Sequence, residues 1–134
     1  MKPYFQKLIC DTETPVSIYA KLAKKSPYAF LLESAEPKER FGRYSIIGFE
    51  PMKLHIFEAG ADENPLEILK KSFEEIFYEP SSELPRLQAG FVGYFCYEVA
   101  RHIEKLNLPS GVAEIPEGIF FLPKNLLIFD NLER

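Results

Sequence analysis

The hydrophobic pattern of this chain predicts a protein of short strands and two well-marked helices. Several short runs either combine β-branched, aromatic and leucine side chains or alternate apolar with polar positions, as strands do. These runs are residues 4–10, 28–33, 44–49, 53–58, 119–122 and 126–130.

Both predicted helices begin with a polar cap followed by proline. Thr14-Pro15 and Asn64-Pro65 each place a side-chain acceptor before a residue whose fixed backbone suits the first helical turn. The second helix, predicted over 65–78, carries an apolar stripe that we expect to face the core. The stripe consists of Leu66, Leu69, Phe73, Ile76 and Phe77. A third, shorter helix is expected near 97–105.

The segment 87–97 is apolar on both faces, and Gly90 and Gly93 interrupt it. This pattern favours a central strand that is buried on both sides, with glycines where another backbone approaches closely. With the other elements it predicts an α+β fold, a mostly antiparallel sheet with two or three helices packed on it.

The last predicted strand runs into Asn131-Leu132, a turn-like sequence, and the sequence stops before a return strand. A finished domain rarely leaves such a strand edge unpaired. We therefore expect residues 1–134 to be a fragment, the N-terminal portion of a larger two-sheet α/β sandwich.

Charge and composition argue against several function classes. The net charge is 16 − 20 = −4 and the basic residues are scattered, which disfavours a nucleic-acid surface. The first residues lack the apolar core of a signal peptide, and the longest apolar run, 89–97, is far shorter than the roughly 20 residues of a membrane helix. Cys10 and Cys96 form no paired motif in their apolar segments, so we expect buried free thiols in a cytoplasmic protein.

Few residues offer chemistry for catalysis. His55 and His102 are expected to be structural or surface residues, because no nucleophile–base pair can be assembled around them from the sequence. The segment Gly90-Phe91-Val92-Gly93 lacks the third glycine and the lysine of a phosphate-binding loop. Because no His, Cys or Asp spacing suggests a metal site, we predict neither catalytic residues nor metal ligands in this chain.

One group of polar residues lies where two predicted strands meet. Glu33-Ser34 ends the 28–33 strand, and Arg43-Tyr44-Ser45 begins the next one. A small amino acid would bind its ammonium to a carboxylate such as Glu33, and its own carboxylate to a hydroxyl and backbone N–H groups near Ser34. The alternative is that these residues only cap a strand end, and the chemistry alone leaves both interpretations open.

Three segments, taken in order, resemble the N-terminal region of anthranilate synthase component I. They are Leu-Leu-Glu-Ser-Ala at 31–35, Arg-Tyr-Ser-Ile-Ile-Gly at 43–48 with Pro51, and Ala-Gly-Phe-Val-Gly-Tyr-Phe-Cys-Tyr-Glu at 89–98. The amphipathic helix before the third segment and a later strand ending in Phe-Asp follow the family order. The resemblance therefore covers essentially the whole chain.

This resemblance implies an enzyme, a lyase of tryptophan biosynthesis that converts chorismate and ammonia to anthranilate and pyruvate with Mg²⁺. The ammonia would come from a glutamine amidotransferase subunit, the partner protein, and L-tryptophan would act as a feedback inhibitor. By motif match, Glu33 and Ser34 belong to the tryptophan (effector) site. Arg43, Tyr44 and Ser45 are carried over more loosely, as the start of the adjacent strand.

The resemblance also implies what this chain lacks. The family's chorismate and Mg²⁺ residues lie in C-terminal segments that do not occur here, and neither does the Asn-Pro-Ser-Pro-Tyr segment that completes its tryptophan pocket. We therefore expect the chain alone to be inactive. Three alternatives stay open: the related component I of aminodeoxychorismate synthase in the folate pathway, a module that only docks the amidotransferase subunit, and a stand-alone amino-acid sensor.

Overall fold

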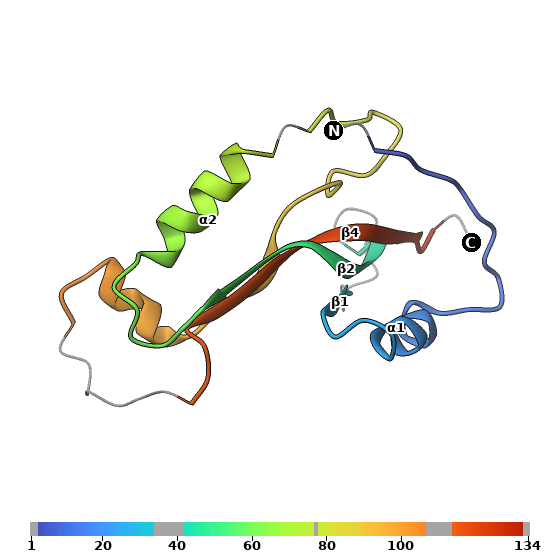
Figure 1. Cartoon of the computed structure of the whole chain (residues 1–134). Helices are drawn as coiled ribbons and strands as arrows, with labels where there is room; N and C mark the ends of the chain where they lie inside the picture. Colours follow the sequence, from blue (N-terminus) through green and yellow to red (C-terminus); the bar gives the residue numbers. More distant parts are fainter. Residues whose placement is uncertain (1–2, 34–41, 77, 107–113, 133–134) are drawn as a thin grey trace.

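A curled antiparallel sheet organises the part of the chain that the computed structural model describes, residues 3–33, 42–76, 78–106 and 114–132 (Figure 1). The strands are β1 (Ala29–Leu32), β2 (Tyr44–Phe57), β3 (Val92–Phe95) and β4 (Gly118–Asp130). The helices are α1 (Pro15–Ala23), α2 (Pro65–Glu74) and the 3-10 helix η1 (Tyr97–His102). The strand order is β1-β2-β4-β3, with antiparallel pairing between neighbours. This architecture confirms the predicted α+β class.

The two longer helices begin where the sequence predicts. Thr14 Oγ1 accepts a hydrogen bond from Ser17 N at 3.1 Å, and Ser17 Oγ accepts one from Thr14 N at 3.0 Å, which forms a reciprocal capping box. Asn64 Oδ1 likewise accepts from Leu66 N at 3.0 Å. Each cap satisfies backbone donors that the first helical turn leaves unpaired.

Helix α2 ends at Glu74, before the predicted boundary, and its apolar stripe does not lie wholly against the core. Phe73 is 59% exposed, whereas Ser72 is buried and contacts His55 of β2. An ion pair between Lys53 and Glu75 adds a second polar contact between the helix end and the strand. The face that α2 turns to the sheet is therefore the one that carries Ser72, and the prediction for Phe73 is wrong.

Strands β2 and β4 each merge two predicted strands into one continuous element. Both pass through a proline, and Pro51 lies opposite Pro123 where the register shifts. Glu50 takes a positive φ of 55° at this point, and its N–H donates to Ser26 Oγ at 3.1 Å. The residues Glu50, Pro51 and Pro123 form a joint between two halves of the sheet, because neither proline has an N–H for the ladder.

The prediction of a buried central strand over 87–97 is wrong. Only Val92–Phe95 is a strand, and it lies at the edge of the sheet, paired with β4. One part of the expectation holds: a Cβ on Gly93 would lie 1.9 Å from Ile119 O, so another backbone does approach closely there. The apolar composition of 87–97 thus reflects packing beside the sheet rather than a place at its centre.

The core is small and lies along the two long strands. Its buried apolar residues are Ile47 of β2, Val99 of η1, and Phe121 and Leu122 of β4. The Phe121 ring lies 5.7 Å from the Phe30 ring, centroid to centroid. Helix α1 packs against β1 and β2, next to the Ile47 half of the sheet.

The N-terminal segment does not form the strand predicted for residues 4–10. It has no strand assignment, and Tyr4 and Ile9 are more than nine-tenths exposed. In Figure 1 this segment passes outside the sheet before reaching α1. Cys10 is exposed rather than buried, and Cys96 is half-buried; both thiols are free, as expected. β-type residues alone do not make a strand, because a strand needs a partner to pair with.

Within the ranges described above, none of the helices has the length and apolar character that crossing a membrane would require.

Candidate effector site

The ends of three strands meet at one corner of the sheet, close to the polar group found in the sequence. Leu32, the last residue of β1, pairs with Ile46 of β2, so Glu33 follows at the level of Ser45. Tyr44, the first residue of β2, pairs with Asp130, the last residue of β4. We call this region the corner, defined by Glu33, the start of β2 and the end of β4.

The structure thus brings together four of the five predicted site residues: Glu33, Arg43, Tyr44 and Ser45. Ser34 lies outside the described residues. Glu33 is exposed at the end of β1, with its carboxylate available to solvent. The roles of these residues in binding an effector remain predictions.

Arg43 makes a charged contact with Asp130 that the sequence did not reveal. Its Nε lies 3.0 Å from both carboxylate oxygens, and its Nη2 donates to Oδ2 at 2.6 Å. Both side chains are partly buried, which strengthens such a charge-assisted, forked contact relative to one in open water. The guanidinium also lies over the Tyr44 ring, 5.1 Å from its centroid. Arg43 is therefore held between β4 and its own neighbour on β2.

Asn131 connects the end of β4 to the beginning of β2. Its backbone N–H donates to Arg43 O at 2.7 Å, and its side-chain Nδ2 lies 3.1 Å from Ser45 Oγ and 3.4 Å from Gly42 O. Ser45 is only 3% exposed. The Ser45 hydroxyl thus faces the interior of the corner, where it accepts from Asn131.

The register explains why the sequence did not single out Asp130 and Asn131 as site residues. They are 87 and 86 positions from Arg43 and Ser45, and only the antiparallel pairing of β2 with β4 brings them close. The available signal was the change from apolar residues to Asp130-Asn131 at the end of the strand. From sequence alone this change predicts only a turn.

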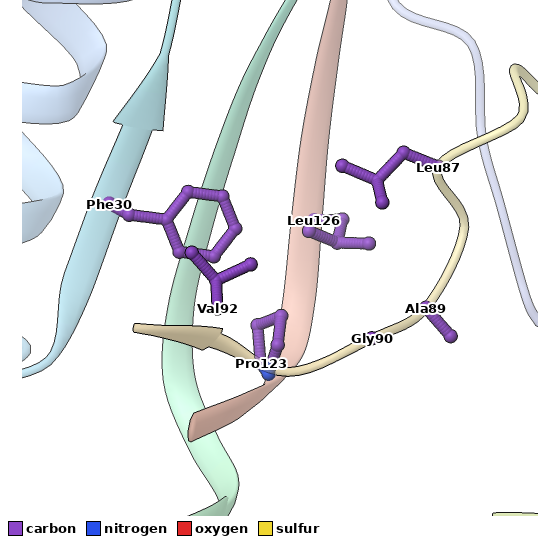
Figure 2. A pocket seen from close by; sticks show the side chains of 7 residues that line it. All are labelled: Phe30, Leu87, Ala89, Gly90, Val92, Pro123 and Leu126. Atoms are coloured by element: carbon purple, nitrogen blue, oxygen red, sulfur yellow. The ribbon is translucent and has the colours of Figure 1, made fainter. Parts of the chain in front are cut away.

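An apolar pocket on the sheet offers no alternative site for an amino acid. Figure 2 shows its lining, which comes from β1, β3, β4 and the segment that precedes β3. The lining residues are Phe30, Leu87, Ala89, Gly90, Val92, Pro123 and Leu126. These side chains carry no charge and no hydrogen-bonding group, so they cannot bind an ammonium or a carboxylate.

The first histidine, His55, contacts a serine hydroxyl that the sequence did not pair with it. Ser72 Oγ lies 2.9 Å from His55 Nε2. Burial lowers the pKa of His55, and the nearby Lys53 charge lowers it further. Ser72 is 5% exposed, so a substrate cannot reach its hydroxyl, and the pair serves to fix α2 on β2.

The second histidine belongs to a polar group around the buried Glu117, at the opposite end of β4 from the corner. His102 Nε2 lies 3.3 Å from Glu117 Oε2, and Arg101 Nη2 lies 2.7 Å from Glu117 Oε1. Arg101 also donates to Ala61 O at 2.8 Å. These contacts tie η1 to the start of β4, as expected of a structural histidine. Across residues 3–33, 42–76, 78–106 and 114–132, no three His, Cys, Asp or Glu side chains are grouped so that they could hold a metal ion.

Comparison of the chain with known proteins finds relatives along nearly its whole length. No protein-family model matches the chain. Anthranilate synthase component 1 of Synechocystis is 36% identical over 150 residues, which cover 98% of this chain and 29% of that protein. The protein of the same name from Thermus thermophilus is 32% identical over a match that covers 100% of this chain and 31% of that protein.

The chain is homologous to the N-terminal region of anthranilate synthase component I. A crystal structure of anthranilate synthase component I from Streptococcus pneumoniae agrees in fold, with a TM-score of 0.52 at 23% identity over 98% of this chain and 30% of that one. The chain spans about three tenths of the length of these relatives.

Proposed function

We propose that this chain is the tryptophan-binding regulatory part of an anthranilate synthase component I subunit. The observation that carries the proposal is the corner. There, in a chain homologous to this family, the exposed Glu33 carboxylate lies at the end of β1, next to the start of β2 and the end of β4. In the proposed mode of binding, the ammonium of tryptophan contacts Glu33, and its carboxylate contacts the hydroxyl and backbone near Ser34.

The proposed subunit converts chorismate and ammonia to anthranilate and pyruvate. Bound tryptophan favours a conformation with low affinity for chorismate, which requires that tryptophan bind the two conformations unequally. Mg²⁺ would supply a Lewis acid for that reaction. Among residues 3–33, 42–76, 78–106 and 114–132, no three His, Cys, Asp or Glu side chains are grouped to hold that ion. In this proposal the chain contributes regulation rather than chemistry and is inactive on its own.

The ammonia is proposed to come from a glutamine amidotransferase subunit. The name "component 1" of the relatives implies a second component. Co-purification of the subunit that contains this chain with a tagged amidotransferase tests that part of the proposal. Failure of the two proteins to associate at micromolar concentration would contradict it.

Substitution of Ser34 tests the tryptophan site directly. In the subunit that contains this chain, Ser34→Phe places a large apolar side chain where the effector's carboxylate is proposed to bind. We expect the tryptophan concentration for half-inhibition to rise by about tenfold or more, which corresponds to one charge-assisted hydrogen bond. The uninhibited kcat/KM should stay within about twofold.

A matched control uses Ser82, an exposed serine in the loop between α2 and β3. Ser82→Phe introduces the same side chain away from the corner and should leave inhibition unchanged. If Ser34→Phe were inhibited by tryptophan as strongly as the parent protein, the proposed site would be wrong.

A further inference from the structure

The end of β4 fixes the chain where it enters β2, at the corner. Asp130 receives the Arg43 guanidinium in a forked contact, and its Oδ1 also accepts from Leu132 N at 3.1 Å. Asn131 bonds to the carbonyls of Gly42 and Arg43 and to the Ser45 hydroxyl. The last residue of β4 and the residue after it therefore contact Gly42, Arg43 and Ser45, where the chain enters β2.

From these contacts we propose that Asp130 and Asn131 are positioning residues for the effector site. In this proposal they do not contact the effector. They hold the beginning of β2 in its pairing with β1, the strand that ends beside Glu33. This inference rests on the proposed function, because it assigns the two residues a role in the affinity for tryptophan.

The contacts trace a short path from Asn131 to Glu33. Asn131 Nδ2 bonds to Ser45, which is buried and can shift little without disturbing its neighbours. The next residue, Ile46, pairs with Leu32, and Leu32 immediately precedes Glu33. Loss of the Asn131 contact would therefore loosen the strand pair that ends at Glu33.

A loosened corner weakens binding in proportion to the fraction of molecules that keep the competent arrangement. The apparent dissociation constant equals the intrinsic constant divided by that fraction. If the arrangement falls to about one tenth of the population, tryptophan binds about tenfold more weakly, and the chemistry of the uninhibited enzyme does not change.

The experiment compares two asparagines of the same segment. Asn131→Ala removes the side-chain contacts to Ser45 Oγ and Gly42 O. Asn125→Ala removes one side-chain hydrogen bond to Glu50 Oε2 (2.9 Å) at the joint, away from the corner. In the subunit that contains this chain, calorimetry should show tryptophan binding weakened about tenfold by Asn131→Ala and by less than twofold by Asn125→Ala. The uninhibited kcat/KM should stay within about twofold for both variants.

A second set of variants keeps the inference testable if Asn131→Ala fails to fold. Arg43→Gln, Asp130→Asn and the double variant form a cycle. If the pair positions the corner as a unit, each single variant weakens tryptophan binding, and the double variant binds no more weakly than the poorer single one. If the two single variants weaken tryptophan binding additively in the double variant, the pair does not act as a unit. A fall in thermal stability in all three variants would not change that conclusion.

The outcomes separate this inference from the proposed function. If Ser34→Phe leaves tryptophan inhibition intact, the proposed site itself is wrong. If Ser34→Phe relieves inhibition but Asn131→Ala and Asn125→Ala bind tryptophan equally well, the site stands and the positioning role is wrong. Hydrogen exchange over residues 29–33 and 44–49 supplies a further measure, since only Asn131→Ala should speed exchange there.

Discussion

The two central strands of the sheet are buried at opposite ends. β2 is buried in its first half, at Ser45, Ile47 and Gly48, and becomes exposed or half-exposed beyond Glu50. The buried residues of β4 lie at 118 and 121–123, and its second half is partly exposed. Because the two strands are antiparallel, the buried half of each lies beside the more exposed half of the other. The joint at Glu50, Pro51 and Pro123 lies between the more buried and the more exposed half of each strand.

The short edge strands explain this difference. β1 pairs with β2 only over residues 46–49, and β3 pairs with β4 only over residues 118–121. Each long strand is therefore buried where a short strand covers its flank. Met52, Leu54 and Ile56 remain more than a third exposed although they alternate as core residues do. Alternation identifies a strand, but neighbouring elements decide which part of it is buried.

The largest test of this comparison uses two isoleucines of β2. Ile47 is fully buried, whereas Ile56 is 43% exposed. We expect Ile47→Ala to lower the free energy of unfolding by about 3–4 kcal/mol, because it removes buried methylenes and leaves a cavity. Ile56→Ala should lower it by less than about 1 kcal/mol. Urea denaturation of the purified protein measures both; equal losses would contradict the division of β2 into two environments.

A smaller effect is expected where β3 covers β4. In Gly93→Ala the new Cβ would meet Ile119 O and Phe120 Cα, so the edge strand must move away. Overpacking of this kind destabilises by about 2–3 kcal/mol. Hydrogen exchange should rise at residues 92–95 and stay unchanged at residues 29–32, on the other edge. Equal exchange at both edges would show that the two halves do not respond separately.

The smallest effect concerns pH and the exposed half of β2. Because the pKa of His55 is lowered below its ordinary value of 6.5, the folded protein binds fewer protons than the unfolded one. The stability linked to His55 is therefore present above pH 6.5 and is lost as pH falls from there through the lowered pKa. His55→Gln should flatten this part of the stability curve, measured by urea denaturation between pH 7.5 and about 5. If the stability curve of His55→Gln matched that of the parent protein, His55 would not be responsible for the loss of stability below pH 6.5.

The sequence predicted the features that depend on local chemistry. The caps at Thr14 and Asn64 follow from side chains that bond to backbone within three residues. The α+β class and the close backbone approach at Gly93 were also predicted, from the overall pattern of elements and from a glycine within an apolar run. The resemblance to anthranilate synthase component I, drawn from three short segments, agrees with the homology found over nearly the whole chain.

Features that depend on pairing over long distances were missed or misplaced. Pro51 was expected to lie between two strands, but it lies opposite Pro123 inside a continuous one. The 87–97 segment looked central because it is apolar, but sheet order is set by partners that the sequence does not name. Asp130 and Asn131 of the corner became visible only through their register with β2. The Glu33 and Ser34 roles remain predictions.

The facing prolines of the joint also bear on how the long strands find their alignment. In the native register the two residues that lack an N–H lie opposite each other, so the missing donors fall at a single position of the ladder. A slip by one residue would separate the prolines, interrupt the ladder at two positions, and turn Ile47 out of the core. We expect this single interruption, together with the burial of Ile47, to disfavour alignments of β2 with β4 that are shifted by one residue.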